Sequence, residues 1–217
     1  EDIWYALGPT AVQREVGAEV IVNINSSPYH AGKRSFRERM VATRASDNEV
    51  YVSYTNMVGG QDELVFDGGS VVFDQTGQLV ARGKQFEEDL VVVDLDIDAV
   101  FNHRLRDPRP RKERSALGTI GTPHVVRHSD YSPGKPKNPV SSSICEPLAH
   151  LPEVYSALVV GVRDYVRKSG FQKTIIGLSG GIDSSLTAAL AVDGLGKDNV
   201  IGVAMPSRYS SEGSLLD

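Results

Sequence analysis

Residues 173–206 constrain the fold more than any other part of the sequence. Residues 173–178 (KTIIGL) have the apolar, β-branched pattern of a buried strand, and residues 183–196 have a helix pattern without proline. Residues 199–206 (NVIGVAMP) repeat the strand pattern. Two strands joined through a helix run parallel with a right-handed crossover. The sequence therefore predicts an open parallel α/β sheet. Since two strands cannot cover both faces of such a sheet, we expect the domain to continue beyond Asp217.

The corner between this strand and helix, GLSGGIDSS, combines two adjacent glycines with three serines and an aspartate. Glycines let backbone N–H groups approach a ligand closely, and the free N–H groups at a helix start attract an anion. Serine and aspartate also begin helices that bind nothing, which is one alternative. A kinase-type P-loop is a second, but it needs a lysine after its last glycine and none is present. The string SGGIDS instead resembles the signature of enzymes that split ATP between its α and β phosphates.

Three strings resemble the glutamine-dependent NAD synthetase family, namely YSALVVGVRDYVRKSGF, GLSGGIDSSLTAALAVDGLG and VIGVAMPSRYSSEGS. The second string alone also fits GMP synthetase, asparagine synthetase or a tRNA-thiolating enzyme, and the third narrows the choice. The resemblance implies the start of a Rossmann-like parallel α/β ATP-pyrophosphatase domain. It implies AMP transfer from ATP to the carboxylate of deamido-NAD, followed by displacement of AMP by ammonia. The loop Ser207–Ser211 would close over the nucleotide and Arg208 would neutralise phosphate, although an ordinary solvated loop explains Arg208 nearly as well.

The same resemblance assigns residues to ATP and Mg²⁺. The expected ATP contacts are Gly177, Leu178, Ser179, Gly180, Gly181, Ile182, Asp183 and Ser184. Asp183 is also expected to support Mg²⁺, which binds a few carboxylates together with phosphate oxygens and water. In the absence of a metal, this carboxylate would complement the dipole of the helix N-terminus.

The N-terminal half predicts a layered domain of mixed strands and helices. The expected elements are a strand at 18–24, a charged helix at 33–48, a strand at 49–57, a hairpin at 68–83 and a strand at 87–98. A further amphipathic helix follows near 151–168, where apolar residues recur every three or four positions, and Gly170 is expected to end it.

The first residues, EDIW, resemble the nitrilase, or carbon–nitrogen hydrolase, family. In that family the nucleophilic cysteine directly precedes Glu-Asp-x-Trp, so we expect it just before Glu1 and expect no catalytic residue in this chain. Cys145 lies in a different context and is not expected to replace it. The resemblance implies the C-terminal half of an αββα sandwich. It also implies that Ser27 holds the α-amino end of glutamine and that Lys33 holds the α-carboxylate end. For Lys33, the alternative is an ordinary surface lysine at a helix start.

Composition separates the two halves. A stretch rich in proline, lysine and arginine lies between them, which favours a solvated linker over a basic binding patch. We expect a glutaminase half at 1–100, a connector at 101–148 and the start of the synthetase domain at 149–217. The net charge of −5 gives no reason to expect nucleic acid, and no apolar run is long enough for a membrane span.

The resemblance to both families implies a ligase that uses ATP, Mg²⁺, deamido-NAD and glutamine or ammonia. The resemblance implies a cytoplasmic homo-oligomer with an ammonia tunnel, and we expect this chain alone to be inactive. Two alternatives stay open. One is another glutamine-dependent amidotransferase with a different acceptor, and the other is a nucleotide-binding module without chemistry.

Overall fold

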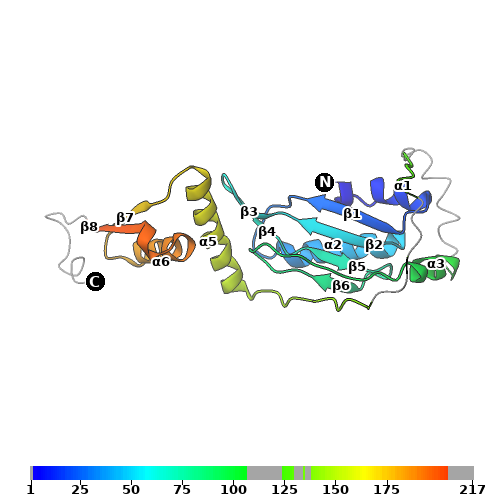
Figure 1. The fold of residues 1–217 in the computed structure, drawn as a ribbon. Helices are drawn as coiled ribbons and strands as arrows, with labels where there is room; N and C mark the ends of the chain where they lie inside the picture. The colour runs from blue at the N-terminus through cyan, green and yellow to red at the C-terminus, as the bar shows by residue number, and fades with distance from the viewer. Residues whose placement is uncertain (1, 107–123, 130–133, 135–137, 205–217) are drawn as a thin grey trace.

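The computed structural model describes residues 2–106, 124–129, 134 and 138–204. It is an α/β protein with two unequal parts (Figure 1). A mixed sheet and its helices form the N-terminal part, and a long helix, α5, lies between that part and a small parallel unit near the C-terminus. None of the helices in the described residues is long and apolar enough to cross a membrane.

The N-terminal sheet has four strands in the order β1-β2-β5-β6. The strands are β1 (Val20–Asn25), β2 (Tyr51–Asn56), β5 (Val71–Phe73) and β6 (Leu79–Arg82). β1 and β2 pair in parallel because the helix α2 (Lys33–Asn48) connects them, whereas β2, β5 and β6 pair antiparallel. The strands predicted at 18–24 and 49–57, the helix at 33–48 and the hairpin at 68–83 are confirmed.

One face of this sheet packs against α2 to form the main core. The core contains Val41 and Ala45 of the helix and Val52, Tyr54 and Val71 of the sheet, all at most 1% exposed. The short 3₁₀ helix at Asp2–Trp4 adds Ile3 to this core, and α1 (Pro9–Glu15) contacts α2. This core holds the ends of β1 and β2 in place, which matters because the candidate glutamine site lies at those ends.

The strand predicted at 87–98 is wrong. Residues 87–96 have no regular structure, and residues 97–106 form a helix, α3 (Ile97–Arg106). The free edge of β6 is occupied by a distant segment instead: Arg82 N–H donates to the Ser143 carbonyl at 3.1 Å, and Cys145 N–H donates to the Arg82 carbonyl at 3.0 Å. The apolar run at 87–98 therefore does not pair at the edge of β6. Asp96 accepts a hydrogen bond from Ala99 N–H at 3.2 Å in the first turn of α3.

A second hairpin, β3 (Val58–Gln61) and β4 (Leu64–Asp67), projects from the sheet toward α5. The helix α5 spans His150–Lys168, close to the predicted 151–168, and Gly170 follows it at φ 83°, as a helix stop requires.

The C-terminal unit contains β7 (Thr174–Leu178), α6 (Ile182–Leu195) and β8 (Val200–Ala204), with a 3₁₀ turn at Lys197–Asn199 before β8. β7 and β8 pair in parallel, from Thr174↔Val200 to Leu178↔Ala204. The predicted strand–helix–strand unit is confirmed. The loop at Ser207–Ser211, with Arg208, lies outside the described residues.

Candidate functional site

The candidate glutamine site forms where β1 ends. β1 stops at Asn25, and the chain then turns through Ser26, Ser27 and Pro28 before α2 starts at Lys33. Ser27 is only 4% exposed, and its backbone N–H donates to the side-chain oxygen of Asn56 at 2.9 Å. Asn56 is the last residue of β2, so the neighbouring strand fixes the position of this loop.

Lys33 faces the same loop from the helix. Its ammonium donates to the Pro28 carbonyl at 2.7 Å and lies 6.0 Å from the centre of the Trp4 ring, within cation–π range. Burial and the nearby Arg37 charge lower the pKa of Lys33, while the Asp67 carboxylate partly opposes them. The Lys33 side chain is therefore partly desolvated, and its ammonium form suits a carboxylate ligand.

A cavity of about 380 Å³ lies between these groups. It is lined by Trp4, Tyr5, Asn25, Ser26, Ser27, Pro28 and Lys33. Its size is that of a small-molecule site. The structure thus brings both predicted glutamine-binding residues, Ser27 and Lys33, to one cavity, together with Trp4 from the EDIW string.

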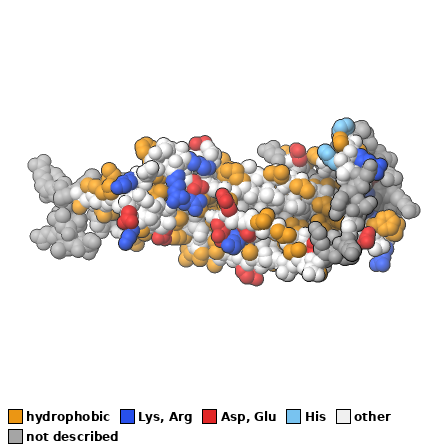
Figure 2. Space-filling view, in the orientation of Figure 1, with side chains coloured by type: hydrophobic (Ala, Val, Ile, Leu, Met, Phe, Trp, Pro, Cys, Tyr) orange, Lys and Arg blue, Asp and Glu red, His pale blue; other side chains and the backbone are white. Residues whose placement is uncertain are grey.

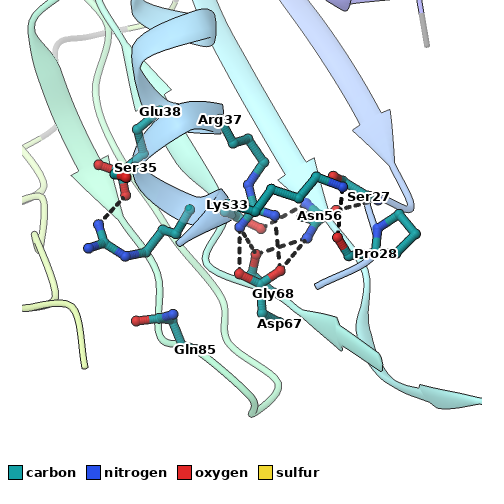
Figure 3. A network of polar contacts seen from close by, with 12 residues as sticks. Ser27, Pro28, Lys33, Ser35, Arg37, Glu38, Asn56, Asp67, Gly68 and Gln85 are labelled. Carbon is teal, nitrogen blue, oxygen red and sulfur yellow. Dashed lines mark hydrogen bonds and ion pairs between the residues drawn. The ribbon is translucent and has the colours of Figure 1, made fainter. Parts of the chain in front are cut away.

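A buried polar network lies next to Ser27, Pro28 and Lys33 of this cavity (Figure 3). Arg37 and Asp67, each 1% exposed, form a bidentate ion pair at 2.9 and 2.7 Å. The Asn56 amide group donates to Asp67 at 3.3 Å and to the Gly68 carbonyl at 3.1 Å, and the same side chain accepts the Ser27 N–H. The ion pair therefore orients Asn56, which in turn holds the Ser27 loop.

This network was not predicted. Arg37 lies in the sequence one turn before Val41, on the face of the helix that the apolar pattern places inward. A charged residue on that face signals a buried partner. The sequence does not say which acid provides the partner, because Asp67 is thirty positions away, at the end of β4 in the β3–β4 hairpin.

The second candidate site is the turn from β7 into α6. Gly177 and Leu178 end the strand, and Ile182, Asp183 and Ser184 open the helix. Between them Gly180 has φ 72°, a left-handed conformation that favours glycine, and Gly181 is the N-cap without a side-chain hydrogen bond to the helix amides. The amides of the first helical turn therefore point into an exposed corner, where an anion can reach them.

Serine hydroxyls line this corner. The Ser184 hydroxyl donates to the Gly181 carbonyl at 2.9 Å, accepts the Ser179 N–H at 3.3 Å, and lies 3.2 Å from the Ser179 hydroxyl. These contacts fold the loop back over the helix start. A Cβ on Gly181 would lie 3.4 Å from the Ser179 oxygen, an ordinary contact, so the positive φ of Gly180 is the feature of this corner that favours glycine.

Asp183 is exposed in the first turn of α6 and supplies the carboxylate of this corner. Within the described ranges no three His, Cys, Asp or Glu side chains gather as a metal-binding group. A single carboxylate beside a phosphate cradle suits Mg²⁺, which takes its remaining ligands from phosphate and water.

The two candidate sites lie on opposite sides of α5 (Figure 1). The structure brings together the predicted residues of each site, but it does not join the two sites.

Comparisons with known proteins match the two ends of the chain to two different family models. Residues 1–103 match the family model for carbon-nitrogen hydrolase, and residues 154–217 match the model for NAD synthase. The glutamine-dependent NAD(+) synthetase of Aquifex aeolicus is 50% identical over the whole chain, and that of Thermotoga maritima is 44% identical. The chain belongs to the glutamine-dependent NAD⁺ synthetase family.

The chain spans 37% of the length of these two relatives. Among solved structures, the glutamine-dependent NAD⁺ synthetase of Acinetobacter baumannii, in complex with ADP, is 33% identical with a TM-score of 0.69. That match covers 94% of this chain and 32% of the solved one. The similarity to synthetases of this family therefore extends over both halves of the chain.

Proposed function

We propose that this chain contributes to ATP-dependent amidation of deamido-NAD with glutamine as nitrogen donor, giving NAD⁺, AMP, pyrophosphate and glutamate. The observation that carries the proposal is the presence of both candidate sites in one chain, each within the matching family segment. We divide the chain into a glutaminase half (1–100), a connector (101–148) and a synthetase part (149–217). We further propose a cytoplasmic homo-oligomer, because the substrates are intracellular nucleotides and the family resemblance implies assembly.

At the glutaminase end, Ser27 and Lys33 hold the two charged groups on the α-carbon of glutamine. The ammonium of Lys33 pairs with the α-carboxylate, and the polar Ser27 loop accepts the α-amino group. Because Lys33 is partly desolvated, its ion pair with a carboxylate is stronger than one on an open surface. The Asn56 contact holds the Ser27 backbone, and Lys33 bonds to the Pro28 carbonyl of the same loop, so both anchors are tied to one segment.

At the synthetase end, residues Gly177 to Ser184 bind the ATP phosphates. A carboxylate is a poor acylating agent, and transfer of AMP to it creates a good leaving group. In that transfer the carboxylate bonds to the α-phosphorus as the bond to the β-phosphate breaks, and negative charge develops on the departing pyrophosphate. The N–H groups of the α6 start and the Ser179 and Ser184 hydroxyls stabilise this charge. Mg²⁺ held by Asp183 would supply further charge neutralisation there.

The proposal is tested in a full-length chimera, in which this chain replaces the region it aligns with in the Aquifex aeolicus relative. With ATP, Mg²⁺, deamido-NAD and glutamine, the chimera should form NAD⁺, AMP, pyrophosphate and glutamate in equal amounts. Replacing deamido-NAD by a GMP precursor or by aspartate should abolish AMP formation. AMP formation with one of those acceptors, or with none, would contradict the proposal and favour a different amidotransferase or a nucleotide module.

A further inference from the structure

The helix α5 contacts the N-terminal part through close polar interactions as well as apolar packing. Both backbone groups of Gly60, in the hairpin β3–β4, are bound by side chains of α5. The Asp164 carboxylate accepts the Gly60 N–H at 2.7 Å, and the Lys168 ammonium donates to the Gly60 carbonyl at 2.6 Å. Figure 2 shows acidic and basic side chains gathered side by side over α5 and this hairpin.

Glycine is required for this approach. A Cβ on Gly60 would lie 3.1 Å from the Asp164 Cβ, and one on Gly59, which has φ 123°, would lie 2.9 Å from an Asp164 carboxylate oxygen. On the helix side, a Cβ on Gly161 would lie 3.2 Å from a Val65 methyl group. The hairpin and the helix are therefore in backbone-to-backbone contact, with little freedom to slide.

The opposite edge of the same hairpin holds the glutamine loop. Gly60 of β3 lies opposite Val65 of β4, and the Val65 carbonyl accepts the Tyr29 N–H at 2.7 Å. Tyr29 is two residues after Ser27. The Tyr29 ring also packs edge-to-face on Phe86 at 5.3 Å, and Phe86 belongs to the cluster formed with Ala157 and Val160 of α5.

The other side of α5 contacts α6, which begins at the ATP loop. The Tyr155 hydroxyl bonds to Asp193 at 2.7 Å, and a Cβ on Gly194 would lie 3.1 Å from the Val159 carbonyl. One rigid helix is thus in contact with the hairpin on one side and the nucleotide-binding helix on the other.

We infer that α5 positions the glutamine loop through the β3–β4 hairpin, with Gly60, Asp164 and Lys168 as positioning residues. The inference rests on the proposed function for its activity readout. A helix fixed against α6 holds the hairpin, the hairpin holds Tyr29, and Tyr29 holds the Ser27 loop at the geometry that binds glutamine. Within the described residues the hairpin connects the two sites through hydrogen bonds, beside the apolar contact of Tyr29 with the Phe86 cluster.

A structural test uses this chain itself. Amide hydrogen exchange is measured for Gly60 and Tyr29 in the wild type and in Asp164→Ala. Both amides should exchange about tenfold faster in the variant, the factor expected for loss of one charge-assisted hydrogen bond. Asp164→Asn keeps an acceptor oxygen and should restore most of the protection. Faster exchange at Gly60 with no change at Tyr29 would overturn the inference, because the hairpin would then not couple the α5 contact to the loop that contains Tyr29.

An activity test uses the full-length chimera with Asp164→Ala and Lys168→Met. The KM for glutamine should rise about tenfold, from the same loss of one hydrogen bond, while NAD⁺ formation from added ammonia changes less than about twofold. The matched controls are Glu63→Gln on the exposed hairpin tip and Lys173→Met beyond α5, and both should leave the KM unchanged.

The outcomes separate the two claims. If the wild-type chimera makes no NAD⁺ from glutamine, the proposed function fails, and the amide exchange still decides the inference. If the wild type is active but both variants behave as the controls do, the positioning role is wrong. Equal loss of the glutamine-driven and ammonia-driven reactions would also overturn it, since that pattern marks general damage to the synthetase part.

Discussion

The buried ion pair beneath the glutamine cavity offers a sharp test of the structure. Arg37→Met removes a guanidinium that makes two short bonds to Asp67 and leaves the carboxylate 1% exposed without its cation. Removing one partner of a buried pair costs about 3–5 kcal/mol, more than the pair itself contributes. Methionine fills much of the arginine volume, so the cavity penalty is small. We expect the free energy of unfolding to fall by that amount.

The assay is urea unfolding followed by the fluorescence of Trp4, the single tryptophan of the chain. Trp4 stacks on Phe36 of α2 at 5.7 Å, so its signal reports the half that contains the ion pair. The double variant Arg37→Met/Asp67→Leu should recover most of the loss, because no unpaired charge remains. The control Arg39→Met, exposed on the same helix, should change stability by less than about 0.5 kcal/mol. A loss below about 1 kcal/mol in the single variant would refute the reasoning.

Three other outcomes follow from the described contacts. Because burial and Arg37 lower the pKa of Lys33, the KM for glutamine should begin to rise at a pH below the ordinary lysine pKa, and Lys33→Arg should remove that rise. Identical pH profiles of the KM in the wild type and the variant would show that Lys33 does not bind the carboxylate. Asp183→Asn in the full-length chimera should slow NAD⁺ formation roughly tenfold to a hundredfold, while glutamate release without acceptor stays within about twofold. Equal loss of both activities would show that the role of Asp183 is not confined to the synthetase site. Gly77→Ala should lower the free energy of unfolding by more than about 1 kcal/mol, since Gly77 has φ 81° and a Cβ there would lie 2.8 Å from the Ala42 carbonyl. An unchanged midpoint of urea unfolding would contradict that geometry.

Elements set by local patterns were predictable from the sequence. The helix at 33–48 follows from a long charged run without proline or glycine, and the hairpin at 68–83 follows from its DQTG turn. In the structure the Asp74 carboxylate accepts the Thr76 and Gln78 N–H groups at 2.8 and 2.9 Å, which is why that turn is readable locally.

Features set by distant segments were not predictable. Residues 87–98 have the apolar content of a strand, but pairing requires a free edge, and residues 143–145 occupy the edge of β6. The pairing of Arg37 with Asp67 and of Gly60 with Asp164 likewise joins parts of the chain that the sequence keeps far apart. For the candidate sites, the sequence indicated Ser27, Lys33 and the corner at 177–184, whereas the groups that hold them in place came from the structure.

The most direct test of the account follows the nitrogen atom. The full-length chimera is given glutamine labelled with ¹⁵N in its side-chain amide, together with unlabelled ammonium in the buffer, ATP, Mg²⁺ and deamido-NAD. Transfer from the Ser27–Lys33 cavity to the acceptor activated at the Gly177–Ser184 turn predicts ¹⁵N in the carboxamide of the NAD⁺ formed. NAD⁺ carrying nitrogen only from the buffer, while labelled glutamine is left unhydrolysed, would contradict the account.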